Sequence, residues 1–218
     1  MQKHHQNTEN NYPKPIKPSK PQTIFMKRVI LVTGTPCIGK TTTSKALAQK
    51  LGAQYINLTD YAKSNNLVVE EDKERNSLII DEENMSRKLT ETVNASENAN
   101  IIIDGHYASA VTPTEQVTKV FVLRRDPREL KQFMEKCGYT GSKMWENLAA
   151  EIIDVCLSEA LELQVGKVCE LNVTGRSVDE IVGEILDVLE KRKGCFFGIV
   201  DWLGMLEKEG LIDQYLKM

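Results

Sequence analysis

Long apolar runs are missing from this sequence of 218 residues. No stretch approaches the roughly 18 uninterrupted apolar residues that a membrane-spanning helix needs. The first 20 residues are polar and lack the apolar segment of a secretory signal. These absences argue against a membrane protein, and they predict a cytoplasmic location with no membrane partner.

Cysteine is also scarce. The cysteines are odd in number, and no two of them lie in a C-x-x-C spacing. A disulfide framework or a zinc site normally shows an even or clustered set. We therefore expect neither, and we expect reduced, partly buried thiols at Cys37, Cys137, Cys156, Cys169 and Cys195.

An excess of positive charge is lacking too. The chain has 28 Lys and Arg against 31 Asp and Glu, a net charge of −3. A generic nucleic-acid coat is strongly basic, so we expect no direct, sequence-specific nucleic-acid binding. Apolar residues make up 41% of the chain, and 13 glycines bring the total into the usual globular range of about 45–50%. The chain can therefore bury a core.

The composition changes along the chain. Residues 1–26 hold four of the seven prolines and a net charge of +3, which leaves −6 for the remainder. Proline at this density favours extended chain. We therefore expect a disordered basic tail over residues 1–26, with Met26 as an alternative start of translation. A folded domain is expected over 27–192 and an extension over 193–218.

Short apolar runs alternate with amphipathic segments inside the predicted domain. The predicted strands cover residues 29–32, 53–58, 101–104, 120–123 and 168–171. After a first helix that ends near Leu51, the predicted helices cover residues 83–93, 127–136, 143–163 and 177–189. Apolar strands that alternate with helices indicate a parallel sheet covered on both faces. We predict an α/β, doubly wound, five-stranded fold.

The extension carries an apolar face of its own. Ile199, Trp202, Leu203 and Leu206 recur at helical spacing. Such a face belongs either to a helix docked on the parent domain or to a partner-binding surface. The docked helix is the interpretation we favour.

Residues 34–41 match the pattern G-x-x-x-x-G-K-[ST] without a gap. The motif leaves an apolar strand and enters a helix, so backbone N–H groups of the loop would point at phosphate oxygens. In this pattern the lysine contributes charge to the β- and γ-phosphates, and the threonine offers a hydroxyl to Mg²⁺. We therefore predict a P-loop NTPase fold that uses ATP and Mg²⁺. The predicted nucleotide-binding residues of the motif are Gly34, Pro36, Cys37, Gly39, Lys40, Thr41 and Thr42.

A P-loop needs an acidic residue near the magnesium. Asp104 ends a predicted buried strand, and ligands of open α/β sheets collect at such ends. We expect Thr41 and Asp104 to hold Mg²⁺. His106 either orders a water or a phosphate, since imidazole exchanges protons near neutral pH, or is a loop histidine with a backbone partner. The predicted catalytic residues are Lys40, Asp104 and His106.

Two large classes of P-loop protein are disfavoured. No N-K-x-D sequence marks a guanine-specific GTPase, and no L-S-G-G-Q marks a transporter ATPase. The chain length and the single P-loop near the start fit a small nucleotide kinase.

Several further motifs occur together with the P-loop. They are T-G-T-P-x-x-G-K-T-T at 33–42, I-N-x-x-D at 56–60, I-I-D-x-H at 102–106, V-L-R at 122–124 and G-Y-x-x-x-K-x-x-E-N-x-x-x-E at 138–151. In these motifs the chain resembles the adenylate kinase isoenzyme 6 family, in an archaeal style, over about residues 28–190.

The resemblance implies a function. It implies an ATP:AMP phosphotransferase with ATPase activity that acts in small ribosomal subunit maturation. It implies an AMP-binding region at about 57–80, a short lid at about 136–147 and a catalytic Asp-x-His pair. It also implies a protein partner, a small-subunit ribosomal platform protein of the S11 type.

The chain departs from the family pattern at several charged positions. Phe133 and Cys137 stand where the family has arginines before the lid, Lys63 stands where an arginine for the monophosphate is expected, and Cys37 replaces a loop glycine. Lost guanidinium groups favour weak kinase activity with nucleotide binding retained. The remaining residues that we expect to bind nucleotide or substrate are Arg124, Arg176, Asp60 and Lys63.

Three functions stay open at this stage. The first is transfer of phosphate from ATP to AMP. The second is an assembly factor in which ATP binding and slow hydrolysis switch affinity for a ribosomal protein. The third is another small-molecule kinase, although no sequence feature marks a distinctive acceptor pocket.

Overall fold

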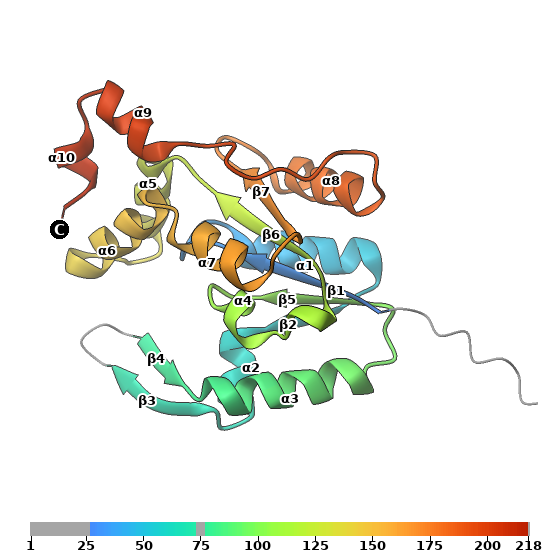
Figure 1. The fold of residues 1–218 in the computed structure, drawn as a ribbon. Coiled ribbons are helices and arrows are strands. Elements are labelled where there is room, and N and C mark those ends of the chain that lie inside the picture. The colour runs from blue at the N-terminus through green and yellow to red at the C-terminus, as the bar shows by residue number, and fades with distance from the viewer. Residues whose placement is uncertain (1–26, 73–76, 218) are drawn as a thin grey trace, which may run out of the picture.

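A five-stranded sheet forms the centre of the computed structural model, which describes residues 27–72 and 77–217 (Figure 1). The predicted tail at residues 1–26 lies outside the described residues. Within them, no helix is long and apolar enough to cross a membrane.

The sheet is parallel throughout, with the strand order β2-β5-β1-β6-β7. Its strands are β1 (Arg28–Thr33), β2 (Gln54–Asn57), β5 (Asn100–Asp104), β6 (Val117–Arg124) and β7 (Val168–Asn172). The three inner strands consist mainly of valine, isoleucine and leucine because both of their faces are buried. The predicted α/β, doubly wound, five-stranded fold is confirmed.

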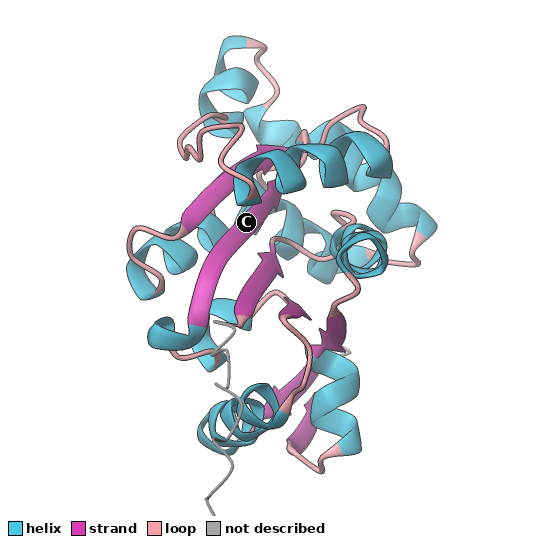
Figure 2. Ribbon diagram, turned by 90° about the vertical axis from the view of Figure 1, so that its right-hand side faces the viewer, coloured by secondary structure: helices cyan, strands magenta, loops and turns pink. Residues whose placement is uncertain are grey.

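Helices cover both faces of this sheet (Figure 2). Ile30 and Val32 of β1 pack into one core with α1 (Lys40–Leu51), α5 (Pro127–Lys136), α6 (Gly141–Ile152) and α8 (Val178–Leu189). Val29 and Leu31 pack into the other core with α2 (Leu58–Ser64), α3 (Glu82–Ala95), α4 (Ala108–Val111) and α7 (Val155–Leu163). Alternate residues of a strand point to opposite faces, which is why one strand supplies both cores. A short 3₁₀ helix, η1 (Thr114–Gln116), precedes β6.

The chain order places two loops side by side. β1 lies between β5 and β6, and the chain runs from β1 to β2 on one side of it and later from β5 to β6 on the other side. Val32 of β1 pairs with Asp104 of β5, so the loops that follow these strands start next to each other. This is a topological switch point, where open α/β sheets bind their ligands.

The helix predicted over 143–163 is two helices. α6 ends at Ile152, α7 begins at Val155, and Asp154 between them adopts a left-handed conformation with φ 62°. The carbonyl oxygen of Glu151 accepts a hydrogen bond from Arg124 Nη2 at 2.9 Å, and Asp154 forms an ion pair with the same guanidinium. The carbonyl oxygen of Glu151 thus accepts from this buried arginine at the point where the helix is interrupted. Apolar periodicity in the sequence does not reveal such an interruption.

The segment between β2 and α3 contains a hairpin that the sequence did not predict. β3 (Val68–Asp72) and β4 (Ser77–Ile80) pair antiparallel and extend from the body of the molecule (Figure 1). Of the acidic run at 70–75, residues 70–72 belong to β3, and residues 73–76 lie outside the described residues.

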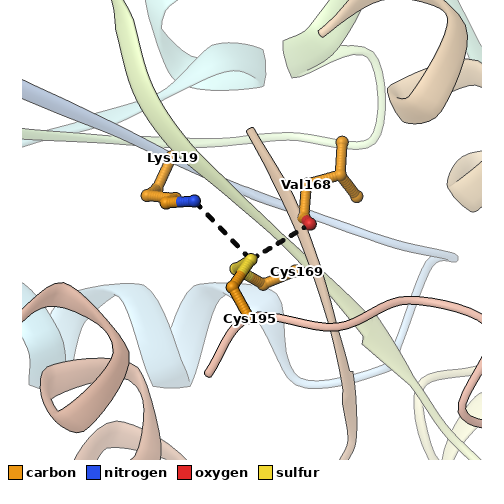
Figure 3. The surroundings of a disulfide bond; sticks show 4 residues. All are labelled: Lys119, Val168, Cys169 and Cys195. Atoms are coloured by element: carbon orange, nitrogen blue, oxygen red, sulfur yellow. Dashed lines mark hydrogen bonds between the residues drawn. A yellow bond between two sulfur atoms is a disulfide. The ribbon is translucent and has the colours of Figure 1, made fainter. Parts of the chain in front are cut away.

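The C-terminal extension first runs along the edge strand β7. Glu170 N donates to Phe196 O at 2.8 Å, and Ile199 N donates to Glu170 Oε2 at 2.8 Å. A disulfide joins Cys169 of β7 to Cys195, with their Cα atoms 5.0 Å apart, and Lys119 Nζ lies 3.6 Å from Cys195 Sγ (Figure 3). The expectation of reduced thiols is therefore wrong for this pair, because tertiary packing brings together two cysteines that no sequence spacing links.

Two short helices, α9 (Trp202–Lys208) and α10 (Ile212–Tyr215), complete the extension. Trp202 and Leu206 of α9 are buried, which agrees with a docked helix. Asp201 caps α9 by accepting a hydrogen bond from Gly204 N at 2.8 Å, so the helix begins at Trp202. Ile199 precedes the helix and is exposed.

Candidate active site

The loop between β1 and α1, residues 34–39, has the backbone geometry of a phosphate-binding loop. Gly34 and Gly39 have φ of 133° and 109°, and a Cβ on Gly34 would lie 2.6 Å from the carbonyl oxygen of Leu123. Glycine is required where the backbone passes this close to a neighbouring strand. Thr42 lies in the first turn of α1, where amide groups have no partner inside the helix.

Lys40, the first residue of α1, reaches back over this loop. Its Nζ donates to the carbonyl oxygens of Gly34 and Thr35, both at 2.8 Å. Burial lowers the pKa of Lys40, while the charges of Asp104 and Glu151 act in the opposite direction. The arrangement holds a positive charge at the centre of the loop.

Asp104 lies at the end of β5 and is 1% exposed. Its Oδ2 accepts hydrogen bonds from Thr41 Oγ1 at 2.7 Å, Tyr55 OH at 2.8 Å and Asn57 Nδ2 at 3.0 Å. Its Oδ1 is buried and has no hydrogen-bond partner among the described residues. A buried carboxylate oxygen without a partner is costly.

The residues around Asp104 fit a divalent cation. Carboxylate and hydroxyl oxygens are the ligands that Mg²⁺ prefers. The unpaired Oδ1 belongs to the same carboxylate whose Oδ2 accepts a hydrogen bond from the Thr41 hydroxyl. The described residues contain no group of three or more His, Cys, Asp or Glu side chains arranged for a metal. A cation at this place would therefore rely on few protein ligands, as Mg²⁺ commonly does.

The roles of Tyr55 and Asn57 were missed by the sequence analysis. Both residues lie on β2, and Asn57 pairs with Asp104 in the register of the sheet. The hydrogen bond to Asp104 and burial raise the pKa of Tyr55 to about 12, with burial the larger cause. The only available signal was the I-N-x-x-D motif, which contains Asn57 but gives it no partner.

His106 follows Asp104 by two residues, and both residues line one cavity. Its ring packs edge-on against Tyr107, with ring centroids 4.8 Å apart. Burial, together with the positive charges of Lys40 and Lys143, lowers the pKa of His106 to about 4. The imidazole is therefore neutral at physiological pH.

A cavity of about 520 Å³ joins these groups. The predicted site residues that line it are Pro36, Cys37, Lys40, Thr41, Asp104 and His106. Tyr139, Lys143 and Asn147, from α6 and the turn before it, also line the cavity, as do Leu78 and Ile80 of the hairpin.

Asp60 and Lys63 are not brought to this cavity. Asp60 lines a separate pocket of about 310 Å³ at the edge of the sheet, together with Tyr61 and Thr92. Lys63 is exposed near the end of α2 and lines neither pocket. Helix α2 therefore directs both side chains away from the loop that holds Lys40.

Arg124, which the sequence predicted to bind nucleotide, does not line the cavity. Its side chain is 1% exposed and points beneath α6. Nε donates to Glu151 and Nη1 to Glu170, both at 2.9 Å. Burial lowers the pKa of Arg124, but the charges of Glu151 and Asp154 outweigh this effect and raise it. The guanidinium therefore forms its hydrogen bonds with buried carboxylates inside the protein.

The next residue, Arg125, lies behind the phosphate loop instead. Its Nε and Nη2 lie 3.4 and 3.3 Å from the carbonyl oxygen of Ile38, and it forms an ion pair with Glu129. Its guanidinium also lies 4.5 Å from the ring centre of Phe133. Both arginines are buried, and the sequence does not show which partners each of them has.

Arg176 lies in the turn after β7, as the sequence predicted, but it is engaged there. Nη1 donates to Asn172 O at 3.0 Å, Nη2 donates to Glu180 O at 3.1 Å, and the guanidinium lies 2.6 Å from Glu184. A contact of Arg176 with adenine stays a prediction.

Glu151 of α6 connects the loop to the rest of the fold. This carboxylate is 1% exposed and accepts from Thr35 Oγ1 at 2.7 Å, Arg125 N at 3.1 Å and Trp202 Nε1 at 3.1 Å, besides Arg124. One buried side chain thus ties the phosphate loop, β6 and the C-terminal extension together.

Comparison with known proteins links this geometry to a family. The family described as "AAA domain" matches residues 30–154. A protein named "Putative adenylate kinase" from Methanocaldococcus jannaschii is 39% identical over 79% of this chain and 92% of its own length. A protein of the same name from Thermococcus kodakarensis is 38% identical over 80% of this chain and 92% of its own length.

Solved kinases share the fold. The shikimate kinase from Acinetobacter baumannii in complex with shikimate has a TM-score of 0.56 at 14% identity, over 77% of this chain and 95% of that one. The shikimate kinase from Bacteroides thetaiotaomicron has a TM-score of 0.53 at 19% identity, over 75% of this chain and 98% of that one. At such low identity these likenesses support the fold alone.

Proposed function

This chain belongs to the family of the archaeal proteins named putative adenylate kinase, and from that premise we propose that it transfers the γ-phosphoryl group of ATP to AMP. In this reaction the bond between the γ-phosphorus and the β–γ bridging oxygen breaks. A bond to a phosphate oxygen of AMP forms, and two ADP result. The observation that carries the proposal is the single cavity that joins Lys40, Thr41 and Asp104 beneath the start of α6.

The phosphate loop would bind the phosphates of ATP. Backbone N–H groups of the loop, apart from Pro36, which has none, and those of the first turn of α1 are suited to phosphate oxygens. Lys40 adds a charge that the loop carbonyls already hold in place. Cys37 lines the cavity with its backbone in the left-handed region at φ 64°. It therefore takes the conformation that a loop glycine would take.

Thr41 and Asp104 would hold Mg²⁺. Tyr55 and Asn57 fix one oxygen of Asp104, which leaves the other oxygen for the cation. When bound, Mg²⁺ neutralises charge on the β- and γ-phosphates. The two residues on β2 act by orienting the carboxylate.

Lys143 is the cation that α6 brings to the cavity wall. The two positions expected to carry arginines hold Phe133 and Cys137, and the Phe133 ring lies against Arg125. Lys143 would therefore take over charge neutralisation at the transferred group, as a point charge without the fork of an arginine.

An acceptor assay tests the proposal directly. The purified chain is incubated with ATP and Mg²⁺, with and without AMP, and nucleotides are separated by chromatography. We expect ADP to form rapidly only when AMP is present, at two ADP per AMP consumed. GMP, CMP and shikimate serve as matched acceptors, and phosphate release that is indifferent to AMP would contradict the proposal.

A second function is favoured by the missing arginines. Arg125 is engaged with Ile38 and Glu129 and does not line the cavity. Slow ATP hydrolysis coupled to small ribosomal subunit maturation would tolerate this arrangement. We would test it by pull-down with the S11-type ribosomal protein, with and without ATP. The absence of binding in both states would argue against this function.

The low pKa of His106 predicts a pH profile. Because the folded protein lowers the pKa of His106 from 6.5 to about 4, the ring stays neutral from about pH 5.5 to 8. We expect kcat/KM for ATP to have no ionisation step from His106 in this range, so the profiles of the parent and of His106→Gln should run parallel. A step near pH 6.5 in the parent alone would show that His106 titrates during turnover.

A further inference from the structure

A chain of hydrogen bonds joins the C-terminal extension to the phosphate loop. Trp202, the first residue of α9, is 6% exposed, and its Nε1 donates to Glu151 Oε1 at 3.1 Å. The other oxygen of this carboxylate, Oε2, accepts from Thr35 Oγ1 at 2.7 Å. One buried side chain therefore lies between a tryptophan of the extension and a threonine of the loop.

The Glu151 carboxylate reaches the loop at two points. The first is Thr35, whose carbonyl oxygen accepts from Lys40 Nζ at 2.8 Å. The second runs through Arg125, whose backbone N–H donates to Glu151 Oε1 at 3.1 Å and whose Nη2 donates to Ile38 O at 3.3 Å. In a trans peptide the N–H points away from the carbonyl of the same peptide group. The bond to Ile38 O therefore turns the next N–H of the loop away from Arg125.

Other contacts hold the extension in place beside Glu151. A disulfide joins its first part to β7. Glu170 N donates to Phe196 O at 2.8 Å, and Ile199 N donates to the Glu170 carboxylate at 2.8 Å. Trp202 follows this anchored segment by three residues, so the position of its N–H is fixed by more than the bond to Glu151.

The donors around Glu151 matter because the carboxylate is buried. Burial raises the pKa of Glu151, and the charge of Arg124 with the hydrogen bond from Thr35 opposes this shift. A buried charge that loses a donor is costly, so the carboxylate moves toward the donors that remain. The indole N–H of Trp202 is a donor that no apolar side chain can replace.

We propose that Trp202 is a positioning residue for the phosphate loop, through which the C-terminal extension sets the affinity of the site for ATP. Its N–H holds Glu151, and Glu151 holds the loop through Thr35 and the backbone of Arg125. That the loop binds ATP rests on the proposed function. Because coupling between two sites is reciprocal, ATP in turn stabilises the docked extension.

The first experiment removes the N–H of Trp202 and keeps an aromatic ring. Calorimetry on the full chain measures the Kd of the β,γ-imido analogue of ATP with Mg²⁺, which binds without transfer. We expect Trp202→Phe to raise this Kd about tenfold, as for the loss of one hydrogen bond to a charged group. Trp145→Phe is the matched control, because Trp145 is the other tryptophan of the chain and its ring faces Lys131 and Lys217. Equal losses in the two variants would contradict the proposal.

The second experiment changes the loop end of the same chain of contacts. Thr35→Val removes the hydroxyl that donates to Glu151, and Thr35→Ser keeps it. We expect Thr35→Val to raise the Kd about tenfold and Thr35→Ser to stay close to the parent. Variants that act through one shared group are not additive. The double variant of Thr35→Val and Trp202→Phe should therefore bind only slightly more weakly than the weaker single variant.

Each readout decides a separate question. A double variant whose loss in affinity equals the product of the two single losses would overturn the proposal. If Trp202→Phe fails to fold by circular dichroism, the Thr35 variants still decide, because equal affinity of Thr35→Val and Thr35→Ser would also overturn it. A parent that shows the expected affinities but never phosphorylates AMP would contradict the proposed function and leave the positioning role of Trp202 intact.

Discussion

Replacement of Lys40 by alanine is expected to lower ATP turnover by about 100- to 1,000-fold or more while the fold persists. Removal of one preorganised group that stabilises transition-state charge typically costs about this much. Lys40 supplies such a group, because its ammonium is held by the carbonyls of Gly34 and Thr35 at the centre of the loop. Its side chain lies at the cavity and supports little of either apolar core. Steady-state turnover and circular dichroism measure the two effects separately.

The matched control lies on the same helix. Lys50 is in the last turn of α1, and its side chain is 49% exposed. Lys50→Ala should change turnover little, and Lys40→Arg should recover only part of it, because a guanidinium does not reproduce a compact ammonium. If Lys40→Ala turned over ATP at the parent's rate, the phosphate loop would not be the catalytic centre.

Replacement of Arg124 by methionine is expected to produce the largest loss of stability. Arg124 is buried between the carboxylates of Glu151, Glu170 and Asp154. Removal of one member of a buried ion-pair network costs about 3–5 kcal/mol, because the remaining charges stay buried without a partner. For a chain of this size, that corresponds to a fall in Tm of roughly 6–20 °C. Thermal unfolding followed by circular dichroism measures it.

Arg128, four residues further along the chain, is the matched control. Its side chain is 41% exposed and pairs with Asp126, which is mostly buried, and with the exposed Glu209. Exposed ion pairs contribute about 0–1 kcal/mol, so Arg128→Met should lower Tm far less. Equal losses in the two variants would mean that the Arg124 network does not stabilise the fold.

The phosphate loop and the five strands of the central sheet could be predicted from local sequence patterns. The G-x-x-x-x-G-K-T motif is local, and its glycines, lysine and threonine act within one turn that joins a strand to a helix. Continuous apolar strands predicted the parallel sheet, because residues buried on both faces leave a pattern in every strand. Asp104 was found because the end of a buried strand is a position that sequence periodicity reveals.

The contacts between side chains that are distant in the sequence could not be predicted in this way. Arg124 and Arg125 are adjacent in sequence, yet Arg124 donates to the buried carboxylate of Glu151, whereas Arg125 donates to the carbonyl oxygen of Ile38 in the phosphate loop. Likewise, only the register of β2 against β5 brought Tyr55 and Asn57 to Asp104, and only packing brought Cys169 to Cys195. Local patterns record how a segment is buried, but the partners of a buried charge or thiol depend on how separate segments pack.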